Sequence, residues 1–312
     1  MRYRLLGQRT GLQVSEMALG TFRLGTPRGG QTDREAARDT LSAYSGAGGN
    51  FIDTSSAYLF GLAEEMVGDF LAEAGRDRFV VASKYGRTAE RAPAPAQVGN
   101  HRVALVAEVE NSLRRLRTDR IDLYFPHSDD GVTPIEEIMR GLDTLVRAGK
   151  IVHIGLSNFP AWRTASAAML ADLRGWAPVA ALQLQYNVLE RGIEREHAPM
   201  AERLGFGLMA WSPLAGGRLV RAMGEEPELT TLRALAGELD ASPDQIALAW
   251  LRGKGVFPVL GARDAAQLSA NLTTSRVVLD PGQIARIDAA STLSLGFPYD
   301  LLRDQQARPD LA

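Results

Sequence analysis

The chain has 312 residues, 45% of them hydrophobic and 23% charged, which is ordinary for a globular protein. The net charge of −2 argues against a broad basic surface for nucleic acid or anionic membranes, and the lack of cysteine excludes disulfides and thiolate chemistry. The N-terminus MRYRLLGQRTG is too polar for a signal peptide, and no apolar run approaches the roughly 20 residues of a membrane helix. We therefore expect a cytoplasmic protein with one domain over residues 1–312.

In chain order, the sequence first predicts a small hairpin from Tyr3 to Leu6 and from Leu12 to Val14, joined through Gly7 and Gly11. Eight short β-rich runs then alternate with longer helical patterns. These runs predict strands over residues 17–20, 50–53, 79–84, 121–125, 151–156, 181–185, 207–211 and 256–260. The strands lack alternation of polar and apolar residues, as expected of a parallel sheet covered by helices.

The clearest helix is predicted between Pro134 and Ala148, where apolar residues recur at helical spacing. Thr133 is expected to cap it, with Pro134 at the first helical position and Glu136 closing a capping box. Similar start signals stand at Ser242–Gln245 and Thr32–Glu35. Residues 294–312 are expected to be irregular and to lie over one end of the fold.

Eight strands alternating with helices predict an α/β fold, a (β/α)8 TIM barrel with a short N-terminal hairpin and an irregular C-terminal segment. An open doubly wound sheet is the competing architecture. The strand count favours the barrel, and so does the lack of a Gly-x-Gly-x-x-Gly turn after the first strand.

The predicted strand ends carry groups that can ionise, donate hydrogen bonds or stack. In a barrel of this class such ends gather at one mouth, where the chemistry takes place. They are Gly20, Thr21, Phe22, Asp53, Lys84, His127, Ser157, Asn158, Gln183, Trp211, Ser212, Gly261 and Arg263.

Taken singly, these residues have structural explanations. Asp53 suits a turn, Lys84 a strand end that reaches solvent, and His127 a packed position. No two histidines stand at metal-ligand spacing, so no metal site is predicted. Taken together, Asp53, Lys84 and His127 end three neighbouring strands, and Tyr58 follows on the loop after Asp53.

This group suits the protonation of a carbonyl oxygen as it gains negative charge. We expect the ammonium of Lys84 to lower the pKa of Tyr58, Asp53 to hold that ammonium, and His127 to donate a hydrogen bond to the substrate.

The chain also resembles the aldo-keto reductase superfamily from about residue 2 to 290. The motifs FIDTSSAY with GLAEEMVG, VVASKYG, TPIEEIMRGLDTLVRAGKIVHIGLSNF, ALQLQYNVLER, AWSPLAGG and VLGARDAAQLSAN follow that family's order and spacing. LVRAGKI, IGLSNF and SPLAGG look like the bacterial reductases related to potassium-channel β-subunits.

The resemblance implies an NADPH-dependent oxidoreductase that reduces an aldehyde or ketone to an alcohol. Tyr58 would be the general acid, Lys84 paired with Asp53 would tune it, and His127 would orient the carbonyl.

The resemblance also implies the cofactor contacts. Ser157, Asn158 and Gln183 would bind the nicotinamide carboxamide, and Trp211 would stack on its ring. Arg263 would meet the 2′-phosphate, which favours NADPH over NADH. The whole implied cofactor set is Gly20, Thr21, Asp53, Ser157, Asn158, Gln183, Trp211, Ser212, Pro213, Leu214, Gly216, Gly261, Arg263, Gln267 and Asn271.

A small-molecule carbonyl compound is the expected partner, and the oligomeric state is left open. The expected substrate contacts are Phe22, Leu59, Tyr85, His127 and Ser128. Leu59 stands where relatives often have glycine, which should narrow the pocket beside Tyr58.

Two other functions are compatible with parts of this pattern. One is a non-catalytic NADP-sensing or scaffold subunit. The other is a barrel aldolase in which Lys84 forms a Schiff base, although that chemistry gives no role to Tyr58.

Overall fold

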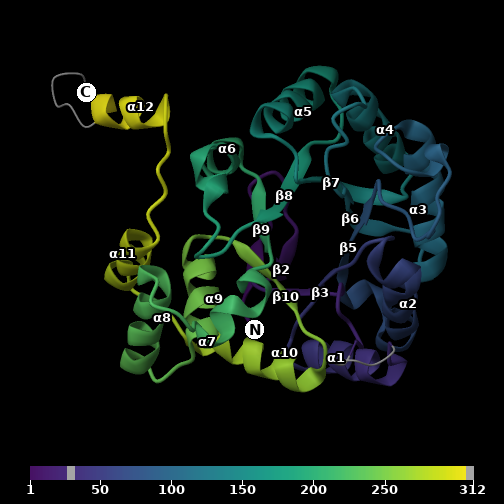
Figure 1. Ribbon diagram of the computed structural model, residues 1–312. Helices are drawn as coiled ribbons and strands as arrows, with labels where there is room; N and C mark the ends of the chain where they lie inside the picture. Colours follow the sequence, from purple (N-terminus) through teal and green to yellow (C-terminus); the bar gives the residue numbers. More distant parts are fainter. Residues whose placement is uncertain (27–31, 307–312) are drawn as a thin grey trace.

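The computed structural model describes residues 1–26 and 32–306, and its centre is a barrel of eight parallel strands closed on itself (Figure 1). Neighbouring strands follow the order β10-β3-β4-β5-β6-β7-β8-β9. Their bounds are β3 Ala18–Gly20, β4 Phe51–Asp53, β5 Val80–Tyr85, β6 Ile121–Pro126, β7 Ile151–Ser157, β8 Val179–Gln185, β9 Gly207–Trp211 and β10 Phe257–Gly261. All eight predicted strands are present, with ends within two residues of those expected, so the (β/α)8 prediction is confirmed.

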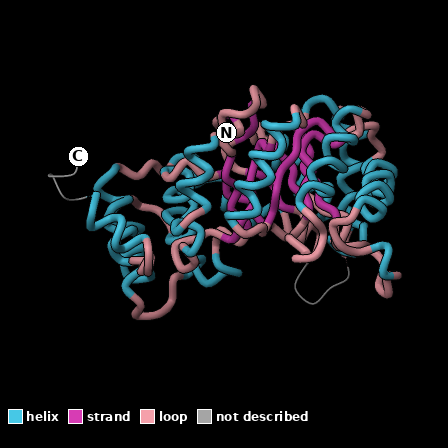
Figure 2. Tube along the Cα trace, turned by 90° about the horizontal axis from the view of Figure 1, so that it is seen from above, coloured by secondary structure: helices cyan, strands magenta, loops and turns pink. Residues whose placement is uncertain are grey.

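Helices form a layer around the outside of the strands, as Figures 1 and 2 both show. Because the strands contact helices on their outer face and one another's side chains on the inner face, both faces are buried. The helices are α1 Arg34–Gly46, α2 Leu62–Ala74, α3 Arg102–Leu116, α4 Ile135–Arg147, α5 Ala161–Arg174, α6 His197–Leu204, α7 Arg218–Arg221, α8 Pro227–Glu238, α9 Pro243–Gly253, α10 Ala265–Leu272, α11 Pro281–Ala290 and α12 Tyr299–Gln306.

Alternate side chains along each strand point into the barrel, since successive strand residues face opposite sides. On β4, Phe51 belongs to the inner apolar cluster, whereas Ile52 packs in the outer cluster between strands and helices. Asp53, the next residue, therefore faces inward at the mouth. The same alternation turns Lys84 inward on β5 and leaves Tyr85 in the outer cluster.

The predicted hairpin closes the opposite end of the barrel. It consists of β1 Tyr3–Leu5 and β2 Gln13–Ser15, which pair antiparallel. Leu6 and Val14 belong to the inner apolar cluster. The N–H of Gln8 donates to the carbonyl of Gly205, just before β9. The end of the barrel that the hairpin closes is thus filled with apolar side chains, and the polar strand-end side chains lie at the other end.

Gly155 on β7 shows how tightly the barrel interior is filled. A Cβ built at this position would lie 2.1 Å from a ring carbon of Phe125 on β6. Glycine is therefore required here by the aromatic ring beside it rather than by a turn.

The helix starts agree only partly with expectation. The Ser242 start of α9 is confirmed, with Gln245 accepting from the backbone N–H of Ser242. The Thr133 box is wrong: α4 begins after Pro134 with no side-chain cap, because the Thr133 hydroxyl donates to Asp130 instead. At the start signal expected over Thr32–Glu35, the capping residue of α1 is Asp33 rather than Thr32.

The C-terminal segment also differs from expectation. Residues 294–306 are not irregular throughout, because α12 forms at Tyr299–Gln306, and Figure 1 shows it at the upper left, outside the ring of helices. The Tyr299 hydroxyl donates to Glu196, just before α6, and Arg195 donates to the carbonyl of Ser294. Residues 307–312 lie outside the described residues. In the described part of the chain, no helix is both long and apolar enough to cross a membrane.

Candidate active site

A buried ion pair lies under the mouth of the barrel, between the ends of β4 and β5. The Nζ atom of Lys84 donates to both carboxylate oxygens of Asp53, at 2.8 and 2.7 Å, and to the carbonyl of Thr54 at 2.9 Å. Lys84 is fully buried and Asp53 is 1% exposed. An ammonium group has three N–H donors, and these bonds, together with the side-chain hydrogen bond between Lys84 and the phenol of Tyr58, leave none of them without a partner.

Gln183 completes this group from β8. Its side-chain nitrogen donates to Asp53 at 2.7 Å, and the residue is buried. Burial lowers the pKa of Lys84, but the carboxylate of Asp53 and the phenol of Tyr58 raise it, and the net result is a raised pKa. Lys84 is therefore a fixed cation at neutral pH.

Tyr58 lies directly beside this cation. It begins a short 3-10 turn, η1 (Tyr58–Gly61), and its ring centroid is 5.0 Å from the Nζ atom of Lys84. Burial raises the pKa of the phenol, while the charge of Lys84 lowers it; burial prevails and the net pKa is raised. The expected lowering of this pKa is thus not what the structure gives, since removal from water outweighs the lysine. The phenol holds its proton at neutral pH.

The turn that carries Tyr58 has an unusual backbone. Leu59 and Phe60 have φ of 51° and 55°, and Gly61 follows with φ of 87°. A left-handed conformation costs about 1–2 kcal/mol for each residue that carries a Cβ. Such strain persists only where the surroundings impose it, and it is common at functional sites.

A buried ion pair holds this turn from below. Glu64 on α2 accepts from Arg115 Nε on α3 at 2.7 Å and from the hydroxyl of Ser83 on β5 at 2.5 Å. The Arg115 side chain also lies 3.0 Å from where a Cβ of Gly61 would stand. Helix α2 is therefore fixed against the strand of Lys84, which sets the position of Tyr58.

His127 follows β6 on the far side of Tyr58, with 5.6 Å between the two ring centroids. Burial lowers the pKa of the imidazole to about 3, with further lowering by the charges of Lys84 and Arg87. The ring is therefore neutral at physiological pH. Its Nδ1 atom lies 3.1 Å from the Ser55 hydroxyl oxygen. When that hydroxyl donates to Nδ1, the proton of the ring stands on Nε2 and can be donated.

Asn158 joins the ends of three strands on the other side of the mouth. Its side-chain nitrogen donates to the carbonyl of His127 and to the Ser157 hydroxyl, both at 2.9 Å. Its side-chain oxygen accepts from Trp211 Nε1 at 2.9 Å. The backbone of Asn158 is in the left-handed region, with φ of 54°. The indole of Trp211 is thereby held at the end of β9.

The loop after β9 presents open backbone. Ser212 has a positive φ of 52°, and its hydroxyl accepts from the N–H of Gly216 at 3.1 Å. A Cβ at Gly216 would meet nothing within 4 Å. Pro213 is buried beneath the loop, and Leu214 is half-buried.

Arg263 follows β10 on the neighbouring loop. It is half-buried and has no ion-pair partner among the described residues. Its backbone N–H donates to Gln267 on α10, and Asn271 on the same helix is buried. An unpaired guanidinium beside open backbone fits a bound phosphate.

The remaining predicted residues fall in two groups. Gly20 pairs in register with Asp53 and Gly261, and Thr21 donates to the carbonyl of Asp53, so these lie at the mouth. Phe22 and Ser128 also lie there, Phe22 with its ring 5.3 Å from that of Tyr58. Tyr85 does not: it is fully buried in the outer cluster and stacks on Tyr124.

The structure adds residues that sequence reasoning did not select. Thr54 accepts from Lys84 through its backbone, Ser55 meets His127, and the Ser56 hydroxyl donates to the carbonyl of Arg87 at 2.8 Å. The only sequence signal was a run of small polar residues after Asp53, and no spacing rule distinguishes one of them from another.

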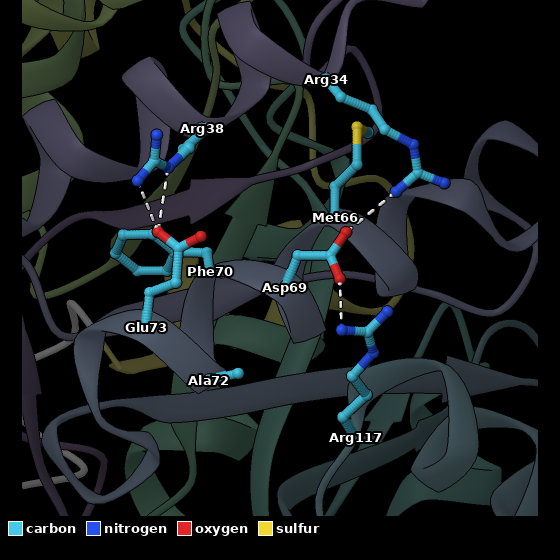
Figure 3. Close-up of a pocket in the computed structure, with 8 residues that line it drawn as sticks. All are labelled: Arg34, Arg38, Met66, Asp69, Phe70, Ala72, Glu73 and Arg117. Carbon is cyan, nitrogen blue, oxygen red and sulfur yellow. Dashed lines mark hydrogen bonds and ion pairs between the residues drawn. The ribbon is translucent and has the colours of Figure 1, made fainter.

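A separate cavity of about 320 Å³ lies in the helical layer between α1 and α2 (Figure 3). Asp69 pairs there with Arg34 and Arg117, and Glu73 pairs with Arg38. Because these charges satisfy one another, the cavity does not compete with the mouth of the barrel as the candidate site. Within residues 1–26 and 32–306, no three acidic or histidine side chains gather in a way that could hold a metal ion.

Comparison with known proteins gives a consistent result. The model of the Aldo/keto reductase family matches residues 16–292. The chain is 34% identical to "Aryl-alcohol dehydrogenase [NADP(+)]" of Phanerodontia chrysosporium, over 97% of this chain and 89% of the relative. It is 35% identical to "Norsolorinic acid reductase stcV" of Emericella nidulans, over 99% and 87%. It is 32% identical to "Putative aryl-alcohol dehydrogenase AAD14" of Saccharomyces cerevisiae, over 98% and 91%. These relatives are fungal, so they support the family and not the narrower bacterial subgroup.

Proposed function

The chain belongs to the aldo/keto reductase family, and we propose that it reduces aromatic aldehydes or ketones to alcohols with NADPH, with Tyr58 as the general acid. The observation that carries the proposal is the Lys84–Asp53 pair, which is buried directly beside the phenol of Tyr58 and faces a neutral His127. The aromatic preference follows the names of the aryl-alcohol dehydrogenases among the relatives.

The side chains divide the work on the carbonyl oxygen. His127 donates from Nε2 and holds the oxygen in place, in the tautomer in which Nδ1 accepts from the Ser55 hydroxyl. Tyr58 keeps its proton until negative charge develops on the oxygen, and then donates it. The charge of Lys84 favours the phenolate that remains. NADPH, when bound, supplies the hydride.

The residues present fit NADPH. Ser157, Asn158 and Trp211 would hold the nicotinamide, and the open loop from Ser212 to Gly216 would follow the pyrophosphate. Arg263, which has no carboxylate partner in the described chain, would take the 2′-phosphate. Gln183 would contribute through its side-chain oxygen, because its nitrogen is already bonded to Asp53.

Two observations favour reduction over the alternatives. An aldolase lysine must be neutral and have a free lone pair, whereas Lys84 is charged and all three of its N–H groups are bonded. A scaffold subunit has no need of an ion pair buried beside a phenol, since a buried pair stabilises a fold little or not at all relative to apolar packing.

The direct test is Tyr58→Phe, with Tyr3→Phe as the matched control. Tyr3 lies on β1, where its hydroxyl donates to the carbonyl of Gly48, far from the mouth. We expect Tyr58→Phe to slow NADPH oxidation at 340 nm by about 10²–10⁴-fold, the usual contribution of a general acid. NADPH affinity, followed by tryptophan fluorescence, should stay within twofold. Turnover close to that of the control variant would show that Tyr58 is not the acid.

We also propose that residues 1–312 form one domain around this site, which the span of the family match and the closed barrel support. The cytoplasmic location and the absence of a nucleic-acid partner stay predictions from the sequence.

A further inference from the structure

Two exposed aromatic residues lie near Tyr58: Phe22, which contacts its ring, and Phe60, which is in the same short turn. Phe22 is 60% exposed and Phe60 is 58% exposed. Phe22 meets the Tyr58 ring edge-on, at an interplanar angle of 75°. Phe60 belongs to the left-handed turn, and it is therefore held outward by a backbone that costs free energy to form. A flat aromatic substrate that reaches the phenol would therefore meet the Phe22 ring, with the exposed Phe60 two residues further along the turn.

Two arginines, Arg87 and Arg91, stand on the loop after β5, beside the turn that carries Tyr58 and Phe60. The carbonyl of Arg87 accepts from Ser56, which fixes this loop against the loop that carries Tyr58. The Arg91 guanidinium lies over the Phe60 ring, 4.3 Å from its centroid. Neither arginine has a carboxylate partner in the described part of the chain, whereas those around the α1–α2 cavity are all ion-paired.

These two guanidinium groups are therefore available to an anionic ligand. The acids on the neighbouring loop after β6 have other partners: Asp129 pairs with Arg163, and Asp130 accepts from Asn100 and Thr133. The charge of Arg87 acts on both reacting side chains: it opposes the rise in the pKa of Tyr58 that burial causes, and it adds to the lowering of the pKa of His127 by burial and Lys84. The charge of Lys84 contributes little to the electrostatic field outside the barrel, because the carboxylate of Asp53 neutralises it within the barrel. The only acid between residues 86 and 100 is Glu90, which is exposed and pairs with neither arginine in the described structure.

Resting on the proposed function, we propose that the site prefers aromatic carbonyl compounds that carry a negatively charged substituent, such as a carboxylate on the ring. The carbonyl meets Tyr58 and His127, the ring lies against Phe22, and the carboxylate meets the guanidinium of Arg87, with Arg91, held over Phe60, adding to the field. A planar guanidinium matches a carboxylate with two parallel hydrogen bonds.

The test compares 4-carboxybenzaldehyde with benzaldehyde in the full-length protein, by NADPH oxidation at 340 nm. The quantity of interest is the ratio of the two kcat/KM values. Comparing this ratio between variants cancels the different intrinsic reactivity of the two aldehydes. The variants are Arg87→Gln, Arg91→Gln and, as a matched control, Arg78→Gln. Arg78 is also exposed and near a phenylalanine ring, and it has no ion pair with any described residue, but it precedes β5 at the opposite end of the barrel.

We expect Arg87→Gln to lower the ratio about tenfold, mainly through a higher KM for the carboxylate, and Arg91→Gln to lower it less. Arg78→Gln should leave it unchanged. Adding 0.5 M NaCl should lower the wild-type ratio as well, since salt screens exposed charges.

An unchanged ratio in both mouth variants would overturn this inference while leaving the proposed reduction intact, provided that benzaldehyde is reduced. A failure to oxidise NADPH with either aldehyde would overturn the proposed function itself.

Discussion

Replacing Asp53 with asparagine tests how the buried cation of the site is held. The substitution keeps the shape of the side chain and removes its charge. Lys84 would then be fully buried with only neutral acceptors, which are the carbonyl of Thr54, the hydroxyl of Tyr58 and the side-chain oxygen of the new asparagine.

The magnitude follows from the geometry. At the 2.7 Å between Nζ and the carboxylate, two unit charges attract by about 6 kcal/mol at an effective dielectric constant of 20. Part of this is recovered by the amide dipole, so we expect D53N to lose about 3–5 kcal/mol of unfolding free energy, as when other buried pairs are broken. That is a large share of the total of about 5–15 kcal/mol that is typical of native proteins.

The assay is urea unfolding followed by tryptophan fluorescence, with D69N as the control. Asp69 also accepts two arginine ion pairs, but it is 38% exposed and its partners more so, so its loss should cost about 0–1 kcal/mol. The double variant D53N/K84M removes the stranded ammonium and should recover part of the loss.

The pH dependence gives a second check. Without the carboxylate, the folded-state pKa of Lys84 falls below its unfolded value of about 10.4. The unfolded state then binds more protons, so D53N should gain stability as pH rises from 7 to 9. In the wild type the raised pKa keeps Lys84 charged throughout this range. A cost no greater than that of D69N, with no such gain, would refute this account of the ion pair.

Three further predictions concern the site and the barrel. S55A should lower kcat by up to about tenfold with little change in KM, because one hydrogen bond contributes about 0.5–1.5 kcal/mol to holding the His127 tautomer; S55T should restore it, and an unchanged kcat would remove Ser55 from the mechanism. The pKa of His127 is about 3 in the folded protein and about 6.5 in the unfolded chain, so the unfolded state binds more protons and stability is lost as pH falls through that interval. The melting temperature should therefore fall more steeply with decreasing pH in the wild type than in H127Q, and parallel curves would contradict this. G155A should cost about 1–3 kcal/mol or more by overpacking Phe125, whereas G11A, where a Cβ meets nothing within 4 Å, should cost far less in the same melt; equal melting temperatures would disprove the tight fit.

The barrel could be predicted because its signal is repeated eight times. Each strand is short, apolar and followed by a helical pattern, so an error in one run does not change the architecture. The convergence of Asp53, Lys84 and His127 followed from the same topology, since neighbouring parallel strands end at the same mouth.

Features that depend on a single packing contact could not be predicted. Thr133 and Pro134 read as a helix start, but Asp130 takes the Thr133 hydroxyl and leaves α4 without a side-chain cap. Tyr85 follows Lys84 directly, and only strand alternation decides that it faces the helices rather than the substrate.

The environment of Tyr58 depends on three-dimensional burial as well. The sequence places a lysine near the phenol, and this indicates a lowered pKa. The extent to which the folded chain removes the phenol from water is not visible in the order of residues, and it reverses the sign of the shift. The left-handed turn at Leu59 and Phe60 is equally hidden, because neither residue type favours it.

The bonding of Lys84 also determines which amines of this protein can be acylated. The chain has three lysines, Lys84, Lys150 and Lys254. Lys150 and Lys254 are partly exposed, at 35% and 27%, in ion pairs with Glu110 and Asp288. Lys84 has neither an exposed surface nor a free lone pair for an activated ester to meet. Amine-reactive dyes or coupling resins will therefore attach at the two outer lysines, and the protein can be labelled or immobilised through them without modifying the buried ammonium of Lys84.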